Sequence, residues 1–364
     1  LSVDTAGSNK TEVTIHALRQ PMAEALRHRL SQQRSMAGEE QTESTPTPLL
    51  TLSEKDLLKL SISANHVEAF FILLSAVYGI FENIKTVNED WVEGAEGWLP
   101  AGSVPLLLLL ATTVLLITIL ISTTRIFFRF YGFSAFATPL GLQLRSGLAN
   151  TRERLVALKK VQFVSWRANW VRRRLGLWLL QYHTAGADEV KSNMKAQVPI
   201  TQKHFISLLV QPYHPLPDLA GTMPVRVHPI YPWRQLLLAG LVPALVLIAA
   251  TVYWWGAKSF NFLLWPPLAG SRAWLYQQKF RLYLYEEVLY LRRGVWGLEK
   301  LILKWNAAQS IAISQSLYQR RKGLANITIH TAAGDISLPY LDITEARQIV
   351  NYGLYKVEKE SETF

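Results

Sequence analysis

The chain contains no cysteine. Disulfide bonds, thiolate nucleophiles and cysteine-ligated zinc are therefore excluded. The sequence also has no HExxH motif, no glycine-rich phosphate loop, no GxSxG and no pair of carboxylates placed for acid–base catalysis. We therefore expect a protein that is not an enzyme and that uses no cofactor and no catalytic metal.

Acidic residues are scarce relative to basic ones. The 364 residues include 38 Lys and Arg against 27 Asp and Glu, which gives a formal net charge of +11. The excess is concentrated between Arg125 and Arg234, where sixteen basic residues stand against four acidic ones. This balance implies an anionic partner, either nucleic acid or the acidic face of a membrane. Because no nucleic-acid reader motif is recognisable, we expect anionic membrane phospholipid and no nucleic acid.

Two long segments lack any charged residue. Val104–Thr124 has 21 residues rich in Leu, Ile and Val. At 1.5 Å per residue, a helix of that length matches the roughly 30 Å hydrocarbon core of a bilayer. Gln235–Ala257 is equally free of charge. A helix in a soluble core rarely runs so far without a polar face, so both segments are predicted to cross a membrane.

Each strong span has a weaker apolar companion, which predicts two helical hairpins. The companions are Val67–Ile84 and Ser259–Tyr276, the second of which Pro266-Pro267 is expected to break. The acidic connector 85–103 should lie outside, and the basic flanks of the spans should lie in the cytoplasm. The prediction is a multi-pass protein of the inner (plasma) membrane.

A stretch of about forty residues occurs twice without a gap, and each shared residue recurs 147 positions later. Both copies contain an Arg-x-Gly, a Gln, an Arg-Arg-x-Gly-Leu and a His-Thr-Ala sequence. These begin at Arg145, Gln162, Arg173 and His183 in the first copy, and at Arg292, Gln309, Arg320 and His330 in the second. A constant offset over this length indicates a duplicated structural unit.

A third, partial copy opens the chain. Leu1–Gly7 matches the tail of the repeat, and the residues after it match the last strand and helix of the repeat. The chain is therefore expected to begin inside a domain whose first half is missing.

The copy that ends the chain is the clearest guide to the fold of the unit. Arg281–Tyr285 and Val288–Arg292 alternate around Glu286-Glu287, which predicts a hairpin. Further strands are predicted at 298–304, 311–314, 324–330 and 336–338. An amphipathic helix is predicted from Ile343 to Val357, with Thr344 as its N-cap. About seven short antiparallel strands and a C-terminal helix make a small β-sandwich or barrel, whose open end the helix plugs.

This order of elements resembles the bacterial pleckstrin-homology-like (PH-like) domain of the YdbS/YdbT type. The resemblance rests on the run from Gln309 through Gln315-Ser316 to Gly323-Leu324, on the Thr-Ala-Gly turn after it, and on the linker-like segment Leu52–Asn65. It covers nearly the whole chain. It implies a membrane protein with several PH-like domains, often paired with a smaller one-domain partner, and it implies no established chemistry. The middle copy departs from the pattern, because Ala168 stands in the place of Gln315.

The predicted fold class is a membrane α+β protein in which tandem PH-like β-barrel or sandwich domains alternate with transmembrane helical hairpins. The predicted segments are the end of a first PH-like domain (1–31), a linker (32–63), hairpin 1 (64–126), a second PH-like domain (127–211), a Pro-rich non-helical tether (212–233), hairpin 2 (234–278) and a third PH-like domain (279–358).

Basic residues near the repeated Arg-Arg-x-Gly sequence are the candidate contacts for an anionic headgroup or a partner. They are Lys159, Lys160, Arg172, Arg173 and Arg174 in the middle copy, and Arg320, Arg321 and Lys322 in the last copy. Each cation near an anionic leaflet contributes about 1 kcal/mol. The alternative is that these loops only follow the positive-inside bias, or that they brace a strand turn. Gln162 and Gln309 are a matched pair that either contacts a partner or satisfies backbone groups at a strand edge.

His183 and His330 occupy equivalent strand positions. Asp4 fills the same place in the partial copy, and no further ligand keeps a metal-binding spacing nearby. We therefore interpret both histidines as ordinary strand residues, and no metal site is predicted.

The leading interpretation is a non-enzymatic inner-membrane protein whose cytoplasmic PH-like domains act as scaffold or anionic-lipid-binding modules. It would form a homo-oligomer or a hetero-complex with a smaller PH-like membrane protein. The resemblance implies a role in envelope stress or in resistance to antimicrobial peptides. The alternative is a transporter or channel component that uses the hairpins. Only Glu68 and Glu82 keep that alternative open, because the two strong spans lack ionisable residues.

Overall fold

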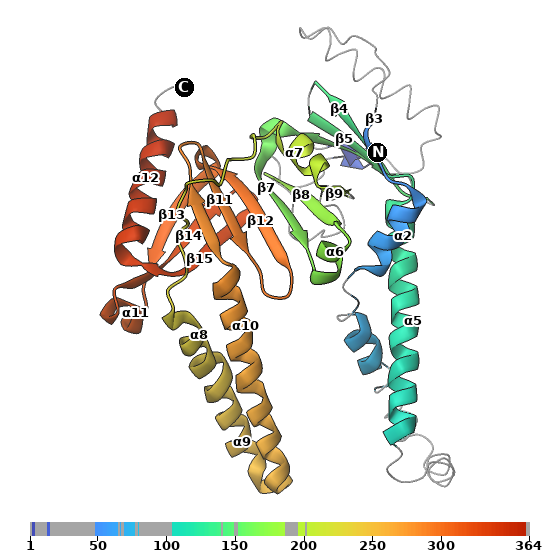
Figure 1. Cartoon of the computed structure of the whole chain (residues 1–364), viewed down its shortest axis with the longest axis vertical. Coiled ribbons are helices and arrows are strands. Elements are labelled where there is room, and N and C mark those ends of the chain that lie inside the picture. The colour runs from blue at the N-terminus through green and yellow to red at the C-terminus, as the bar shows by residue number, and fades with distance from the viewer. Residues whose placement is uncertain are drawn as a thin grey trace.

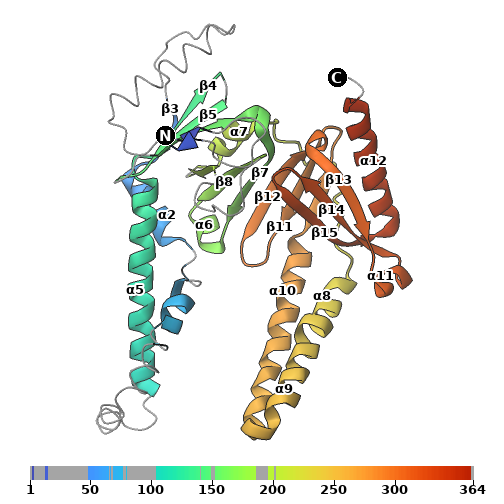
Figure 2. The same cartoon turned by 180° about the vertical axis from the view of Figure 1, so that it is seen from behind.

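The computed structural model describes residues 2–3, 13–14, 48–64, 66, 69–76, 79, 104–139, 141–148, 152–185, 196–200 and 202–361. Two β-sandwich units lie side by side, and helical stalks leave both of them in the same direction (Figure 1). The view from behind shows the same arrangement (Figure 2). The chain is thus an α+β protein built from two tandem units.

The first of these, the middle unit, is preceded by β3 (Pro48–Thr51), α2 (Glu54–Ile62) and the long helix α5 (Val104–Phe130). Its strands are β4 (Ser134–Thr138), β5 (Gly141–Ser146), β6 (Arg152–Ala157), β7 (Val161–Ala168), β8 (Trp178–Thr184) and β9 (Ala196–Ile200). Its short helices are η1 (Leu158–Lys160), α6 (Trp170–Arg174) and α7 (His204–Val210).

The last unit follows a helical hairpin made of α8 (Ile230–Gln235), η3 (Leu236–Leu241), α9 (Val242–Trp255), η4 (Gly256–Leu264) and α10 (Trp265–Lys279). Its strands are β10 (Arg281–Leu284), β11 (Val288–Arg293), β12 (Leu298–Lys304), β13 (Ala308–Ser314), β14 (Leu324–Thr331) and β15 (Gly334–Asp342). Its helices are η5 (Trp305–Ala307), α11 (Leu317–Arg321) and α12 (Ile343–Ser361).

The predicted repeat is confirmed element by element. Strands β7 and β13, helices α6 and α11, and helices η1 and η5 all begin 147 residues apart. The partial copy keeps the repeat's register as well. Its β1 (Ser2–Val3) and β2 (Val13–Thr14) place Val3 opposite Val13, as β14 and β15 place Ile329 opposite Ile336.

The prediction of about seven strands per unit needs correction. Among the described residues each unit has six strands of its own, and the seventh comes from the segment before its stalk. Leu50 of β3 pairs with Ala135, and Val225 forms an isolated bridge with the equivalent residue Leu282. In the part of the chain that the structure describes, the two sheets of a unit share no strand ladder, so the units are sandwiches and a closed barrel is not supported.

One six-stranded sheet joins the two units, in the order β10-β11-β12-β7-β8-β9. The junction is the antiparallel ladder between β12 and β7, in which Leu301 lies opposite Ser165. Tyr290 and Ile302 face the core of the middle unit, whereas Leu289 and Leu303 face the core of the last unit. Burial on both faces explains why β11 and β12 carry consecutive apolar residues and not a strict alternation.

A C-terminal helix closes each core, and its length differs between the units. Ile206, Leu209 and Val210 of α7 are buried, as are Ala346, Ile349 and Val350 of α12. Gln211 keeps helical backbone angles, but Pro212 has no N–H to continue the helical hydrogen bonds, so α7 ends at Val210. Helix α12 continues to Ser361, four residues beyond the predicted end. Gly353 lets α12 pass closely over Trp305 and Ile311, which a β-carbon at that position would approach to 2.9 and 2.5 Å.

The Pro-rich segment is not helical up to Pro229, but the prediction is wrong for Pro232, which lies inside α8. Pro232 falls in the first turn, where a missing N–H removes no helical hydrogen bond. The start of the segment is fastened between the units. The Tyr213 hydroxyl donates to the Gln162 carbonyl (2.7 Å) and accepts from the Lys304 amide (3.0 Å).

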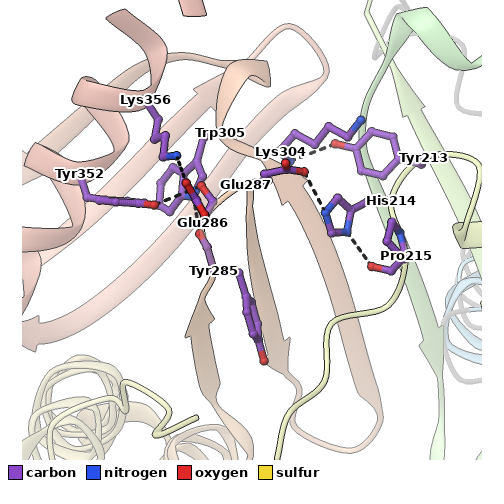
Figure 3. A network of polar contacts seen from close by, with 10 residues as sticks. All are labelled: Tyr213, His214, Pro215, Tyr285, Glu286, Glu287, Lys304, Trp305, Tyr352 and Lys356. Atoms are coloured by element: carbon purple, nitrogen blue, oxygen red, sulfur yellow. Dashed lines mark hydrogen bonds and ion pairs between the residues drawn. The ribbon is translucent and has the colours of Figure 1, made fainter. Parts of the chain in front are cut away.

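The turn between β10 and β11 is held from two sides (Figure 3). His214 Nε2 lies 3.4 Å from a Glu287 carboxylate oxygen. From the other side, the Tyr352 hydroxyl donates to the Glu286 carbonyl, and Lys356 pairs with the Glu286 carboxylate at 3.1 Å. These contacts fix the Pro-rich segment and α12 to the same turn, so the segment is a strap along the last unit and not a free tether.

The hairpin before the last unit is closely packed. Gly240 of η3 lies against Pro266 of α10, and the Trp265 indole donates to the Ala239 carbonyl at 2.7 Å. Pro266-Pro267 lie in the first turn of α10, so the predicted span Ser259–Tyr276 changes there from the 3₁₀ helix η4 to an α-helix. The nine-residue 3₁₀ helix η4 connects the end of α9 to the start of α10. A 3₁₀ helix rises about 2.0 Å per residue, more than an α-helix does.

Two helical segments, Ala111–Phe130 and Ile230–Lys279, are long and apolar enough to cross a membrane by length and composition. The second combines both arms of the hairpin. Helix α5 begins at Val104 as predicted and continues past Thr124 to Phe130. Residues 69–76 of the predicted companion span are helical, whereas Glu68 and Glu82 lie outside the described residues.

Candidate functional site

The face of the two units from which the stalks leave carries several exposed apolar side chains. Helices α6 and α11 both lie toward this side (Figures 1 and 2). Trp170 at the start of α6 is 63% exposed, and its equivalent in α11, Leu317, is 83% exposed. Trp296, in the turn between β11 and β12, is 67% exposed. Large exposed apolar residues beside basic residues are typical of a surface that contacts a membrane or a protein partner.

The Arg-Arg-x-Gly sequence forms the end of a one-turn helix, where a turn was predicted. Asn169 caps α6 and Ser316 caps α11, each accepting from the amide three residues on. Gly176 and Gly323 follow with φ of 72° and 66°, the left-handed conformation in which glycine commonly ends a helix. The basic residues thus lie in the last turn, where a positive charge interacts favourably with the negative end of the helix dipole. This geometry supports the alternative that the Arg-Arg-x-Gly sequence stabilises the turn between two strands.

Arg172 is committed to an internal contact. Its guanidinium donates to the Leu60 carbonyl (3.3 Å) and approaches the Ser63 hydroxyl (3.4 Å) at the end of α2. The Asn169 amide also donates to the Ser63 carbonyl at 2.7 Å. Burial, and then the charge of Arg167, lowers the pKa of Arg172 to about 10. Arg172 therefore holds α2 to the middle unit and is not a free headgroup contact.

The remaining candidate cations form separate groups. Arg173 and Arg174 are exposed on α6, while Arg320, Arg321 and Lys322 are exposed at the end of α11. Lys159 and Lys160 are exposed on η1, which precedes β7, whereas α6 follows it. An eight-residue strand spans about 26 Å. The structure therefore does not bring these two lysines together with the α6 arginines.

Gln162 and Gln309 share a structural position. Each lies at a register shift, between Val161 and Phe163 in β7 and between Ala308 and Ser310 in β13. A β-bulge of this kind bends the strand at its start. The matched glutamines thus mark a common backbone feature of the repeat.

The two repeated histidines have different partners. His183 stacks on Phe163, with ring centroids 4.0 Å apart, and lies 2.9 Å from the Ser165 hydroxyl. His330 pairs with Asp335 at 2.8 Å. Within the described residues, no group of three or more His, Cys, Asp or Glu side chains is placed to hold a metal ion.

Two cavities of moderate size lie against the last unit, among others in the described residues. One of about 630 Å³ lies beside Tyr285, Glu345 and Tyr352, between the β10–β11 turn and α12. Burial, and then the charge of Asp342, raises the pKa of Glu345. The other, of about 320 Å³, lies between α8 and β13–β15 and has polar walls that include Asn326 and Thr328.

Sequence reasoning missed a row of cations on the sheet that joins the units. Arg281, Arg292 and Lys300 lie directly opposite one another across β10, β11 and β12. A signal was present in the repeat, because the matching residues of the middle unit are Ser134, Arg145 and Glu153. Only the register of the strands reveals that the three positions are neighbours.

The family model of the bacterial PH domain matches residues 74–204 and 234–356. The two matches cover more than half of the chain, so the chain belongs to the bacterial PH domain family. Each match begins in a stalk and ends in the C-terminal helix of a unit. The stalk and the sandwich are therefore parts of one family unit, which occurs twice in tandem. None of the curated proteins compared matches this chain.

Proposed function

We propose that this protein is a non-enzymatic scaffold of the inner membrane, whose PH-like units rest on the cytoplasmic leaflet and contact anionic lipid. The observation that carries the proposal is the shared design of α6 and α11. Each exposes one large apolar residue beside basic residues, on the side where the stalks leave. An apolar tip inserts at the headgroup boundary while cations attract an anionic leaflet.

The stalks support a membrane position. Residues 236–255 of η3 and α9 carry no charge, and as a helix they extend about 30 Å. Arg234 lies just before this segment and stacks over the Tyr318 ring at 4.3 Å. Arg125 and Arg129 lie near the end of α5 that joins the middle unit. Basic residues on the unit side of both stalks favour a cytoplasmic location for the units.

A fractionation experiment tests the membrane part of this proposal. The full chain is expected to stay in the membrane pellet after washes with high salt and with alkaline carbonate, and to be released only by detergent. Release by salt alone would mean that charge holds the protein to the surface and that the stalks do not cross the bilayer.

The ladder between β12 and β7 supports the scaffold part. The repeat equivalents of these strands, β6 and β13, each end a sheet with an unpaired edge in the described chain. The residues of β13 after Ala308 are largely exposed, whereas those of β7 are mostly buried under the neighbouring unit. Free edges are sites for strand addition. We infer that β13 of one copy pairs with β6 of another, which repeats the internal junction between molecules.

The YdbS/YdbT-type resemblance adds a smaller PH-like membrane protein as an alternative occupant of a free edge, and a role in envelope stress or antimicrobial-peptide resistance. A transporter remains the second candidate. Its test is the double substitution Glu68→Gln and Glu82→Gln, followed by an assay of solute flux. Loss of flux with an intact fold would favour transport over scaffolding.

A further inference from the structure

Three cations form a row across the sheet of the last unit. Arg281 lies opposite Arg292, and Arg292 lies opposite Lys300. Opposite residues of antiparallel strands project on the same face with their Cα atoms about 4.5–5.5 Å apart. The three positive charges therefore share one narrow strip of surface.

The row lies between the two units, at the stalk end of the sheet. Lys300 lies opposite Trp166 of the middle unit, and its Nζ is 5.6 Å from the Trp178 ring centroid. Arg281 begins β10 two residues after α10 ends, so the row starts where the chain leaves the stalk. The other face of the sheet at this level is the core of the last unit.

Such a row destabilises the bare protein. Like charges directly opposite in a sheet repel one another. The pKa of Lys300 is lowered by burial first, and then by the charges of Arg292, Lys203 and Arg173. The pKa of Arg281 is lowered by burial and by Arg226 and Arg292. In addition, the Arg292 Nε atom is buried without a hydrogen-bond partner.

The nearby carboxylate does not compensate the row. Glu299 accepts from Arg293 at 2.7 Å. Both are one position away from Lys300 and Arg292, so they project from the opposite face of the sheet. Among the described residues, no salt bridge joins a carboxylate to Arg281, Arg292 or Lys300.

The middle unit shows that the fold does not require this charge pattern. Its equivalent row is Ser134, Arg145 and Glu153, in the same cross-strand register. Arg145 and Glu153 form an ion pair at 3.7 Å. The same three positions therefore carry a balanced pair in one unit and three cations in the other. The fold therefore does not need the three cations of the last unit. We interpret this excess of positive charge as a binding site for an anion.

We propose that Arg281, Arg292 and Lys300 bind a phosphate group, carried either by an anionic lipid headgroup or by a soluble phosphate compound. Guanidinium groups match phosphate oxygens in geometry, and the buried Arg292 Nε gains the partner that it lacks. The site lies at the stalk end of the sheet, so a headgroup reaches it from the bilayer surface. The lipid source rests on the proposed membrane function, whereas the phosphate site itself does not.

The test uses the full chain, in detergent for the soluble anion and in nanodiscs for lipid. The substitution is Lys300→Glu, which recreates the balanced pair of the middle unit. Lys55→Glu is the matched control, because Lys55 is exposed on α2 and the change in net charge is the same. Binding of inorganic pyrophosphate is measured by calorimetry. Binding of lipid is measured by thermal unfolding in nanodiscs of phosphatidylglycerol and, for comparison, of phosphatidylcholine.

The wild type and Lys55→Glu are expected to bind at least one of the two anions, and Lys300→Glu to lose that affinity by on the order of tenfold or more. Lys300→Glu should also unfold at a higher temperature without ligand, which shows that the loss is not a folding defect. Binding of phosphatidylglycerol alone identifies a lipid headgroup, and binding of pyrophosphate alone identifies a soluble ligand and removes the lipid source. Equal affinities of the wild type and Lys300→Glu, or no binding of either anion, would overturn the site.

Discussion

Arg292 lies directly opposite Lys300 in the antiparallel pair of β11 and β12. At the equivalent place in β5 and β6, Arg145 faces Glu153 across 3.7 Å. The two units thus share a backbone and differ in the charge that it presents. This difference makes one unit a natural control for the other.

The substitution Lys300→Glu is expected to stabilise the unliganded protein. It removes repulsion from Arg292 and supplies an opposite charge, which is worth roughly 0.2–1 kcal/mol for a cross-strand pair. Thermal unfolding of the purified chain in detergent measures the change. The reverse change in the middle unit, Glu153→Lys, should lower stability by a smaller amount because that pair is more exposed to water. A lower midpoint for Lys300→Glu would contradict the account.

The contribution of Lys300 to the free energy of unfolding is expected to become more favourable as the pH rises in the alkaline range. Burial and neighbouring cations lower the folded-state pKa of Lys300 below its ordinary value of 10.5. The unfolded chain therefore holds this proton more tightly than the folded chain does. At neutral pH the charged lysine lowers the free energy of unfolding by the full amount that corresponds to this pKa difference. That cost declines as the pH rises through the folded pKa toward 10.5. Unfolding measured from about pH 8 upward should give a flatter profile for Lys300→Met than for the wild type.

The N-caps of the two one-turn helices offer a matched comparison. Asn169→Ala and Ser316→Ala each remove a helix cap, which typically costs about 1 kcal/mol. Asn169 also donates to the Ser63 carbonyl at the end of α2. Asn169→Ala should therefore cost about 1 kcal/mol more than Ser316→Ala in unfolding free energy. Equal costs would show that the contact with α2 contributes nothing measurable.

Pairing between copies can be tested with single cysteines, because the chain has none of its own. The register of β12 and β7, carried over to β6 and β13, places Glu153 of one copy opposite Ile313 of another. Mixed Glu153→Cys and Ile313→Cys copies should therefore form a disulfide-linked dimer under mild oxidation. Opposite strand residues lie within disulfide reach.

The control for that experiment is a mixture of Glu153→Cys with Ser310→Cys, which lies three positions away on the opposite face of β13. This mixture should not cross-link. Equal yields from the two mixtures would mean that the copies collide without a defined register, and the proposed junction between molecules would be wrong.

The sequence was sufficient to predict the repeat, the hairpin at Glu286-Glu287 and the helix that begins at Ile343, because each depends on local pattern. It was misleading about Pro232, since a proline in the first helical turn looks like a helix breaker until the start of the helix is known. The ladder between β12 and β7 was not predicted either. Its trace in the sequence, consecutive apolar residues from Val288 to Leu291, indicates burial on both faces but names no partner.

The candidate site was predicted only where it depends on local sequence, and the contacts that depend on distant segments were missed. The arginines of α6 and α11 could be listed from the repeat, but the internal role of Arg172 depends on α2, more than a hundred residues earlier. The row of Arg281, Arg292 and Lys300 depends on strand register, which spacing alone does not give.

We propose above all that the stalks cross the membrane while the units stay in the cytoplasm. Two single-cysteine chains test it, Lys258→Cys at the tip of the last hairpin and Lys322→Cys beside α11. With a membrane-impermeant maleimide on cells whose outer envelope has been opened, Lys258→Cys should be labelled at once, and Lys322→Cys only after the inner membrane is permeabilised. Labelling of Lys322→Cys in cells with an intact inner membrane would contradict the account.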